Sequence, residues 1–279
     1  MYVKCWGARG SIPVSGPQYN RYGGDTACME IRNAQDDILI IDAGTGIRRL
    51  GNQLLEERRF HYHLLFTHAH WDHLMGFPFF KPIFREGTTI HVFRCPSSNG
   101  YAESMITRVM TPPNFPIKYS DLKAKILFED GCPQPFFLGD LKITPIALSH
   151  PNGGCGYRFT ERGKNFVFLT DNELGYCHPG GLRFSDYLDF CKDADFLVHD
   201  AEYTPEEYAK KICWGHSSYT DVVELGIAAG VRRLGLFHHN QERSDTAIDA
   251  IVEDARQRIR NAGSSMECFA LAADMHFNL

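Results

Sequence analysis

The stretch "FTHAHWDHLMG", residues 66–76, places three histidines and an aspartate within six positions, directly behind an apolar run. The residues before it, "YHLLFT", predict a strand that ends at Thr67. A side chain at a strand end leaves the sheet for its rim while its backbone stays rigid, which is the placement that a preorganised site needs. We therefore expect a functional site in this turn, the alternative being a solvated histidine-rich turn.

The residue types in this turn are those that bind transition metals. His68 and His70 lie two positions apart, so both can point the same way from an extended turn, and Asp72 and His73 follow closely enough to serve a second centre. Zinc accepts imidazole nitrogen and carboxylate oxygen, and open catalytic sites combine such ligands with a water molecule. The sequence predicts a metal site here.

Composition is that of an ordinary globular chain. Of 279 residues, 43% are hydrophobic and 23% are charged, which suffices for a full core, and we expect one domain over residues 1–279. The net charge of −5 gives no general attraction to phosphate backbones, so a long nucleic acid would need a local basic patch. Small anionic substrates remain compatible with this charge.

The sequence shows neither a targeting segment nor a cysteine pattern typical of disulfides. The start "MYVKCWGARG" has no apolar signal region and no segment approaches 18 consecutive apolar residues, so we expect no membrane association and a cytoplasmic protein. The nine cysteines are scattered without a CxxC pair, which indicates buried thiols rather than disulfides or a cysteine zinc site.

Further short strands end in His or Asp. "DDILIID" predicts a strand ending at Asp42, "ADFLVHDAE" and "RRLGLFHHN" predict two more, and residues 155–171 predict a hairpin that turns at 162–164. Helices are expected after Asp42, after an N-cap at Ser218 or Thr220, and from Ser244 or Asp245 to just before Gly263. Residues 77–120, rich in Pro and aromatics around the strand "TIHVF", are expected to form loops that wall a pocket.

The segment "THAHWDH" resembles the H-x-H-x-D-H signature of the metallo-β-lactamase superfamily. Other parts of that pattern follow in order: Asp42 in "IDAGTG", His150 in "LSHPNGG", Asp171 in "FLTDNE" and His238 in "LFHHN". The resemblance covers nearly the whole chain. It implies an α/β fold of the four-layer αββα sandwich type, with two divalent metal ions at one edge of the sheets.

The resemblance also implies a ligand set. The first metal would be held by His68, His70 and His150, the second by Asp72, His73 and His238, and Asp171 would bridge them. Two cations about 3.5–4 Å apart need a shared anionic ligand, and a hydroxide held between them is a nucleophile at neutral pH. Zn²⁺ is the expected metal, although Mn²⁺ or Fe suits the same ligands.

Two residues beside this set, His239 and Asp42, each have two possible roles. His239 competes with His238, since side chains alternate along a strand and only one of the two can face the metals. Asp42 is expected to order the ligand turn without binding metal, as the family implies. Its alternative is stabilisation of the "AGTG" turn through local backbone contacts.

The segments "SHPNGGCGYRF", "FLVHDAEYT" and "WGHSSYTDVVELG" resemble the phosphodiesterase branch, which includes ribonuclease Z and the cyclic phosphodiesterase of phosphonate breakdown. The resemblance implies that His216 acts as general acid and that Asp200 orients it, with Asp72 as a further catalytic carboxylate. The alternatives are a helix-entry histidine at His216 and a turn-capping role for Asp200. In the glycine-rich N-terminal segment, Arg9 either contacts a phosphate or is an ordinary surface residue.

The expected substrate is a small or cyclic phosphodiester, for example a cyclic nucleotide. Only 21 positions separate His150 from Asp171, too few for the projecting arm of the bacterial tRNA-processing ribonuclease Z, and the acidic charge agrees, so tRNA is not expected. A thioester or lactam hydrolase and a metal-binding sensor are the alternatives. The resemblance is also compatible with a homodimer.

Overall fold

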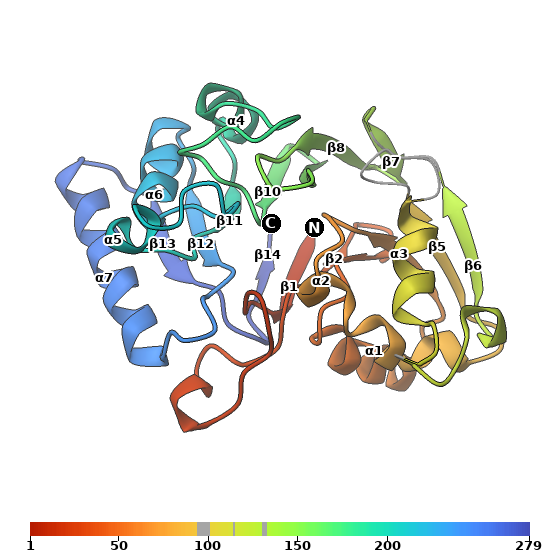
Figure 1. Ribbon diagram of the computed structural model, residues 1–279. Coiled ribbons are helices and arrows are strands. Elements are labelled where there is room, and N and C mark those ends of the chain that lie inside the picture. Colours follow the sequence, from red (N-terminus) through yellow and green to blue (C-terminus); the bar gives the residue numbers. More distant parts are fainter. Residues whose placement is uncertain (94–100, 114, 130–132) are drawn as a thin grey trace.

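The computed structural model describes residues 1–93, 101–113, 115–129 and 133–279 (Figure 1). Within these residues the strands form two seven-stranded sheets. The first sheet has the spatial order β14 (His276–Asn278), β1 (Tyr2–Gly7), β2 (Cys28–Arg32), β3 (Ile38–Ile41), β4 (His61–Leu65), β5 (Thr89–Phe93) and β6 (Lys125–Glu129). The second has the order β13 (Glu267–Ala270), β12 (Arg233–Phe237), β11 (Phe196–Asp200), β10 (Lys164–Leu169), β9 (Cys155–Glu161), β8 (Leu141–Ala147) and β7 (Phe136–Leu138).

Both sheets are mixed in the same way. Neighbouring strands from β14 to β3 and from β7 to β10 pair antiparallel, whereas those from β3 to β6 and from β10 to β13 pair parallel. Each sheet thus has a parallel half, and the carboxyl ends of parallel strands lie at a common edge. This edge is where the histidines and aspartates of the sequence pattern follow their strands.

Alternating side chains bury both faces of each sheet. In β3, Ile38 and Ile40 pack toward the helices of the first half, whereas Leu39 and Ile41 pack between the sheets. In β10, Phe166 and Phe168 enter the same layer between the sheets, whereas Val167 and Leu169 face the helices of the second half. This period-two burial on both faces explains why these strands are continuously apolar in sequence.

Helices cover the outer faces. The first half carries α1 (Ile47–Glu56), the short α2 (Trp71–Leu74) and α3 (Tyr101–Val109), and the second carries α4 (Phe184–Cys191), α5 (Pro205–Tyr208), α6 (Tyr219–Ala228) and α7 (Asp245–Asn261) (Figure 1). Single 3₁₀ turns span Pro17–Tyr19, Phe77–Phe79, Lys81–Phe84 and Tyr119–Asp121. Helix, sheet, sheet and helix make four layers, so the predicted αββα sandwich is confirmed.

The predicted helix boundaries agree with the capping chemistry. The Ser218 hydroxyl accepts a hydrogen bond from the Asp221 backbone N–H, so Ser218 rather than Thr220 caps α6. Ser244 caps α7 in the same way through Ala247. The hairpin between β9 and β10 turns at Arg162 and Gly163, both at positive φ, as predicted.

The expectation of loops throughout residues 77–120 is wrong in part. Beside the predicted strand β5, this region contains the helix α3, which packs Ala102, Met105 and Ile106 into the apolar cluster of the first half. Its apolar residues follow helical spacing, but the prolines and aromatics on both sides obscured that pattern in sequence. The wall of a pocket in this region is therefore a helix face.

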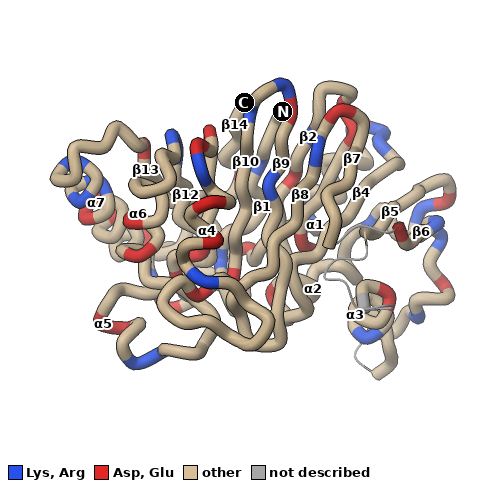
Figure 2. The backbone as a smooth tube through the Cα atoms, turned by 90° about the horizontal axis from the view of Figure 1, so that it is seen from above, with Lys and Arg blue, Asp and Glu red and all other residues tan. Residues whose placement is uncertain are grey.

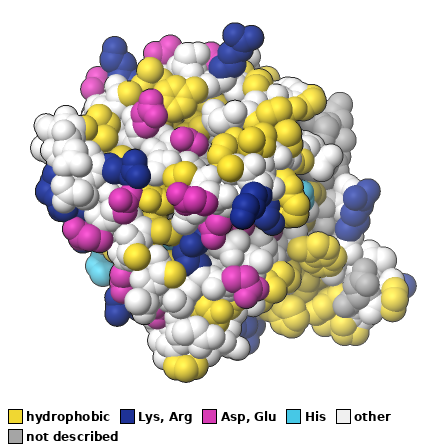
Figure 3. All heavy atoms as spheres, turned by 60° about the vertical axis from the view of Figure 1, so that its left-hand side comes forward, with side chains coloured by type: hydrophobic (Ala, Val, Ile, Leu, Met, Phe, Trp, Pro, Cys, Tyr) yellow, Lys and Arg dark blue, Asp and Glu magenta, His cyan; other side chains and the backbone are white. Residues whose placement is uncertain are grey.

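The surface carries charges of both signs. Along α7, Arg258 pairs with Asp254 and Arg260 pairs with Glu253, so that acidic and basic side chains are interleaved (Figure 2). Apolar, acidic and basic side chains also intermingle on the face turned forward in Figure 3. Among the described helices, none has the length and apolar character needed to cross a membrane.

Candidate metal centre

The polar residues of the pattern gather where strands of both sheets end. In the first half, Asp42 follows β3 directly and the turn with His68 follows β4. In the second half, Asp171 lies just beyond β10 and His238 directly beyond β12. Asp42, Asp171 and His238 all have positive φ, a conformation that Asp and His adopt more readily than most residues. The left-handed backbone turns these three side chains off the strand axis at the sheet edge.

Two groups of side chains meet at this edge, each with its ligand atoms within 4.8 Å of one another. The first group contains His68, His70, His150 and Asp171, and the second contains Asp72, His73, Asp171 and His238. Asp171 belongs to both. The structure thus brings together all seven residues that the resemblance implied as ligands, and it gives Asp171 the shared position.

Two buried nitrogens of these groups face the shared carboxylate of Asp171 without a hydrogen bond. Nε2 of His68 lies 3.6 Å from Asp171 Oδ2, and Nε2 of His73 lies 3.2 Å from Asp171 Oδ1. Neither Nε2 atom has a hydrogen-bond partner although both are buried. An unpaired buried nitrogen is costly, and a bound cation would satisfy it. The donor set, imidazole and carboxylate with a shared carboxylate, fits two divalent metal ions.

The electrostatics differ between the two groups of side chains. Burial lowers the pKa of His73 and His238, but the carboxylates of Asp72 and Asp171 outweigh it and raise both pKa values well above the ordinary one. Burial lowers the pKa of His150 to about 4, so this imidazole is neutral at pH 7 with a nitrogen lone pair to offer. Carboxylates that attract protons this strongly also attract metal cations.

Hydrogen bonds behind the ligands orient the imidazole rings. Nδ1 of His73 donates to Asp42 at 2.8 Å, and Nδ1 of His150 donates to the Gly215 carbonyl at 2.9 Å. Nδ1 of His238 donates to Glu202 at 2.9 Å. With Nδ1 hydrogen-bonded outward in each ring, Nε2 is the nitrogen left for the centre, where a metal ion would replace any proton on it.

Asp42 is fully buried, and its carboxylate contacts the ligand turn. It accepts the backbone N–H of Thr67 at 2.7 Å and the Thr67 hydroxyl at 2.8 Å, besides the bond from His73. These partners come from the turn after β4 and not from the "AGTG" segment. The geometry therefore agrees with a role in ordering the ligand turn.

Two glycines allow close approach to the ligand rings. A Cβ atom on Gly10 would lie 2.2 Å from Nδ1 of His238, and one on Gly215 would lie 2.2 Å from Nδ1 of His150. Gly215 also has a φ of 93°, which disfavours any other residue. In addition, the backbone N–H of Ser11 donates to Asp72 Oδ2 at 2.9 Å, so the glycine-rich N-terminal segment packs against the second group of ligands.

His216 and Asp200 form a pair beside the two groups. Nδ1 of His216 donates to Asp200 at 2.7 Å, and the His216 ring stacks on that of His238 with centroids 4.6 Å apart. Burial opposes a charged imidazole, but Asp200 and Glu202 outweigh it and raise the pKa of His216 to about 9. Asp200, His216 and His238 also form a third group of potential metal ligands. Because His216 and Asp200 are hydrogen-bonded directly to each other, we interpret them as a hydrogen-bonded pair rather than as ligands of a further metal ion.

The structure separates His238 from His239. Nε2 of His238 lies 3.0 Å from Asp72 and 3.4 Å from Asp171, inside the centre. Nε2 of His239 instead donates to the Leu271 carbonyl at 2.8 Å, away from the centre. His199, which precedes Asp200, is a buried residue hydrogen-bonded to Asn172 and to the Asp200 carbonyl.

The expectation for Arg9 is wrong. Its side chain is 0% exposed, so it is neither a surface residue nor available to a substrate phosphate. The guanidinium donates to the carbonyls of Gly23, Asn240 and Arg243, and it lies 3.7 Å from Asp245. Three backbone acceptors and a carboxylate explain how a cation can be buried here. Arg9 ties the N-terminal segment to the start of α7.

Sequence reasoning missed two glutamates near the centre. Glu202 accepts hydrogen bonds from His238 and from the Asn240 amide, and the charges and hydrogen bonds of His216 and His238 outweigh its burial and lower its pKa to about 2. The signal was present, because Glu202 follows Asp200 by two positions, as Glu173 follows Asp171. In an extended chain residues two apart face the same side, but the positive φ of Asp171 interrupts this pattern, so tertiary contacts were needed to place Glu173.

Glu173 joins the segment after β10 to the loop that carries His216. One carboxylate oxygen accepts the Tyr208 hydroxyl at 2.9 Å and the Cys213 N–H at 2.8 Å. The other accepts the Gly215 N–H at 2.7 Å and Nε2 of His178 at 2.8 Å. Gly215 in turn holds His150 through its carbonyl. Glu173 thus fixes the loop between α5 and α6 against His150.

Comparison with known proteins agrees with the fold and the centre. Residues 38–239 match the model of the beta-lactamase superfamily domain, and the chain therefore belongs to this superfamily. A protein named ribonuclease Z from Haloarcula marismortui is 23% identical, with 92% of this chain and 91% of that protein covered.

Solved structures share the fold. The metallo-beta-lactamase fold protein YhfI from Bacillus subtilis superposes with a TM-score of 0.68 at 17% identity, covering 99% of this chain and 98% of that one. A structure described as a new diphosphatase from the PhnP family has a TM-score of 0.68 at 15% identity, covering 100% and 97%. The superfamily and the two ligand groups together support a metal-dependent hydrolase.

The relative named ribonuclease Z bears on the substrate. Because it aligns over nearly the full length of both chains, the comparisons do not support excluding tRNA. The expected homodimer and the expected cytoplasmic location stay predictions.

Substitution of single ligands should change the metal content in steps. We expect two bound ions per chain after incubation with Zn²⁺, about one in His70→Ala or His238→Ala, and fewer than one in Asp171→Ala, since only Asp171 serves both groups. Elemental analysis after gel filtration measures this. The exposed His61 supplies the control variant His61→Ala, which should keep both ions. A His238→Ala protein that also keeps both would contradict the assignment of the second group.

Replacement of Glu173 should destabilise the protein without removing a ligand. In Glu173→Gln one oxygen becomes an NH₂ group that faces two donors, so we expect a loss of roughly 1–3 kcal/mol in the free energy of unfolding. Urea unfolding of this variant beside Glu206→Gln, a substitution on the exposed α5, makes the comparison. Equal stabilities would show that the network around Glu173 is not formed in solution.

Proposed function

We propose that this protein is a dinuclear metal-dependent phosphodiesterase that acts on small or cyclic phosphodiesters such as cyclic nucleotides. The observation that carries the proposal is the His216–Asp200 pair, placed directly beside the two ligand groups. Hydrolysis of a thioester by a metal-activated water does not need such a pair, because a thiolate departs without a proton. Hydrolysis of a phosphodiester does, because a departing alkoxide must be protonated and charge on the phosphoryl oxygens must be met.

We assign the residues as follows. One ion would be held by His68, His70 and His150, the other by Asp72, His73 and His238, and Asp171 would be shared. When bound, these ions would polarise the phosphoryl group and lower the pKa of a water molecule to near neutrality. Zn²⁺ is our first choice, because it suits imidazole-rich sites with few carboxylates.

His216 would protonate the leaving group. Its Nδ1–H is donated to Asp200, which leaves Nε2 as the atom that can exchange a proton with the substrate. Asp200 would hold the ring orientation, and its other oxygen accepts the Glu202 N–H at 3.0 Å, so the carboxylate itself is fixed. Asp72 would contribute as a ligand held in place by the Ser11 N–H.

The preference for a small substrate rests on the segment between His150 and Asp171. Its residues form the β9–β10 hairpin with a tight turn, and no projecting arm is inserted there. Residues 151–170 are all described, so this statement covers the whole segment. Because a relative is named ribonuclease Z, RNA belongs among the substrates that a test must include.

The first test is hydrolysis of bis(p-nitrophenyl) phosphate by the metal-loaded protein, with a chelator-treated sample, a thioester and a precursor tRNA measured in parallel. We expect metal-dependent release of nitrophenol without thioester cleavage. Thioester turnover without diester turnover would move the assignment to the thioesterase alternative. Metal binding with no turnover of any substrate would favour a sensor, and efficient tRNA cleavage would overturn the preference for small substrates.

His216→Ala should separate a general acid from a structural histidine. We expect a loss of about 10²-fold or more in kcat with a diester whose leaving group is an alkyl alcohol, such as a cyclic nucleotide. The loss should be much smaller with bis(p-nitrophenyl) phosphate, because nitrophenol departs as a stable anion. Metal content should stay at the wild-type level. Equal losses for both substrates would contradict the role of proton donor.

A further inference from the structure

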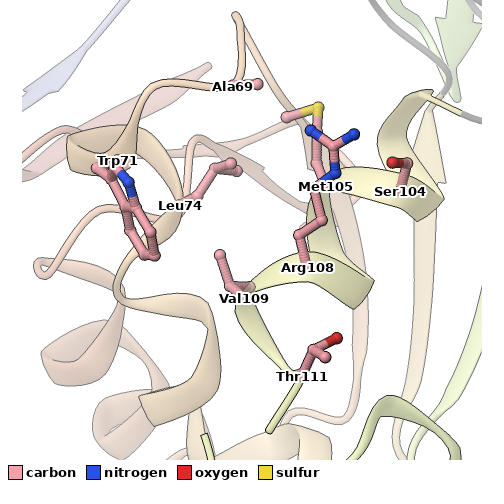
Figure 4. A pocket seen from close by; sticks show the side chains of 8 residues that line it. All are labelled: Ala69, Trp71, Leu74, Ser104, Met105, Arg108, Val109 and Thr111. Atoms are coloured by element: carbon pink, nitrogen blue, oxygen red, sulfur yellow. The ribbon is translucent and has the colours of Figure 1, made fainter. Parts of the chain in front are cut away.

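A cavity of about 510 Å³ lies beside the metal centre, between the ligand turn and α3 (Figure 4). Its volume is within the range of small-molecule binding sites, roughly 300–1,000 Å³. The lining residues are Ala69, Trp71 and Leu74 from the turn and α2, and Ser104, Met105, Arg108, Val109 and Thr111 from α3 and the residues after it. None of these residues has a role in the proposed reaction.

The cavity and the metal centre share one wall. Ala69 lies between the ligands His68 and His70, and Trp71 lies between His70 and Asp72. Consecutive Cα atoms are about 3.8 Å apart, so one short segment of backbone both borders the cavity and carries proposed ligands. The one helical turn of α2 sends Asp72 and His73 inward, where they are buried, and leaves Trp71 on the other side.

Trp71 is 60% exposed, which is unusual for the largest apolar side chain. Its indole forms one side of the cavity, and the α3 residues Met105, Arg108 and Val109 lie across from it (Figure 4). Met105 and Val109 are buried and form an apolar base. A flat group that enters this space would cover the indole face and gain both stacking and apolar contact.

The polar side chains that line the cavity indicate which kind of ligand it would bind. Arg108 offers only hydrogen-bond donors, and the hydroxyls of Ser104 and Thr111 can accept or donate. The Thr111 hydroxyl already donates to the Thr107 carbonyl at 2.5 Å, so it faces a ligand mainly as an acceptor. A hydrocarbon chain would leave these groups unused. A heteroaromatic ring with exocyclic oxygen and nitrogen atoms matches both the indole and the polar groups.

We propose that this cavity is a subsite for the nucleobase of a nucleoside phosphodiester, with Trp71 as the stacking residue and Arg108 with Ser104 as polar contacts. The inference rests on the proposed phosphodiesterase function and names the class of group that the ester carries. Stacking of a base on an aromatic side chain contributes about 1–3 kcal/mol, which corresponds to roughly 5–150-fold in affinity.

Two esters with the same leaving group provide the kinetic test. Thymidine 5′-(p-nitrophenyl) phosphate and methyl p-nitrophenyl phosphate both release nitrophenol and differ by the nucleoside. We expect wild-type kcat/KM to be at least about tenfold higher for the thymidine ester, mainly through KM. Trp71→Ala should reduce this ratio at least about fivefold, and Trp71→Phe should retain most of it.

A second variant and a control guard against indirect effects. Ser104→Phe fills the cavity from α3, far in sequence from every ligand, and should also reduce the ratio. Phe137→Ala removes another exposed aromatic side chain, on the edge strand β7, and should leave the ratio unchanged. Metal content is measured for each variant, so that a loss of ligands cannot be mistaken for a loss of the subsite.

Binding is measured independently of turnover, by calorimetry and indole fluorescence with thymidine 5′-phosphate and methyl phosphate. We expect tighter binding of the nucleotide by about tenfold or more, and loss of that difference in Trp71→Ala. If neither ester is hydrolysed but the nucleotide still binds more tightly than methyl phosphate, the proposed phosphodiesterase function is wrong and the proposed subsite is retained. Turnover of both esters with equal kcat/KM, or a preference that survives both Trp71→Ala and Ser104→Phe, would overturn the subsite.

Discussion

The buried carboxylate of Asp171 is the constraint on which the rest of the centre depends. It follows a strand of the second sheet, yet its oxygens face His68 and His73 from the first sheet and His238 from its own. An isolated carboxylate at this depth would be expensive, so its position requires opposite charge around it. Both sheets must therefore be packed in one relative position before either ligand group exists.

Hydrogen bonds on the far side of the histidine rings connect the centre to the surrounding strands and loops. Asp42, Glu202 and the Gly215 carbonyl each accept a hydrogen bond from Nδ1 of one histidine, which leaves Nε2 of that ring for the centre. Glu173 then fixes Gly215. His73, His238 and His150 are thus each held by a residue from a different strand end or loop.

The same turn serves two purposes. Its inward side chains Asp72 and His73 complete a ligand group, and its outward side chain Trp71 forms a wall of the cavity against α3. One helical turn is enough, because successive residues point about 100° apart around the axis. In our proposal, these four residues thus carry both metal ligands and a wall of the subsite for the nucleobase.

Much of the fold and of the ligand set could be predicted from the sequence. The continuous apolar character of "ILII" and "FVFL" predicted strands. Ser218 and Ser244 marked the starts of two helices. The pattern "THAHWDH" predicted four of the proposed ligands together, because residues that are neighbours in sequence on a rigid turn are also neighbours in space. Short strands with mixed burial, such as β6, β7 and β14, escaped prediction, since packing rather than local preference decides them.

The sequence by itself determined which residue types stand at the strand ends, and these suffice to indicate a metal site. Only the tertiary structure decided that His238 and not His239 faces the centre, that Arg9 is buried on backbone carbonyls, and that Glu173 and Glu202 support the ligands. The physical reason is that each of these facts depends on which groups from distant segments meet. Periodicity fixes the direction of a side chain within its own strand, but not what lies opposite it.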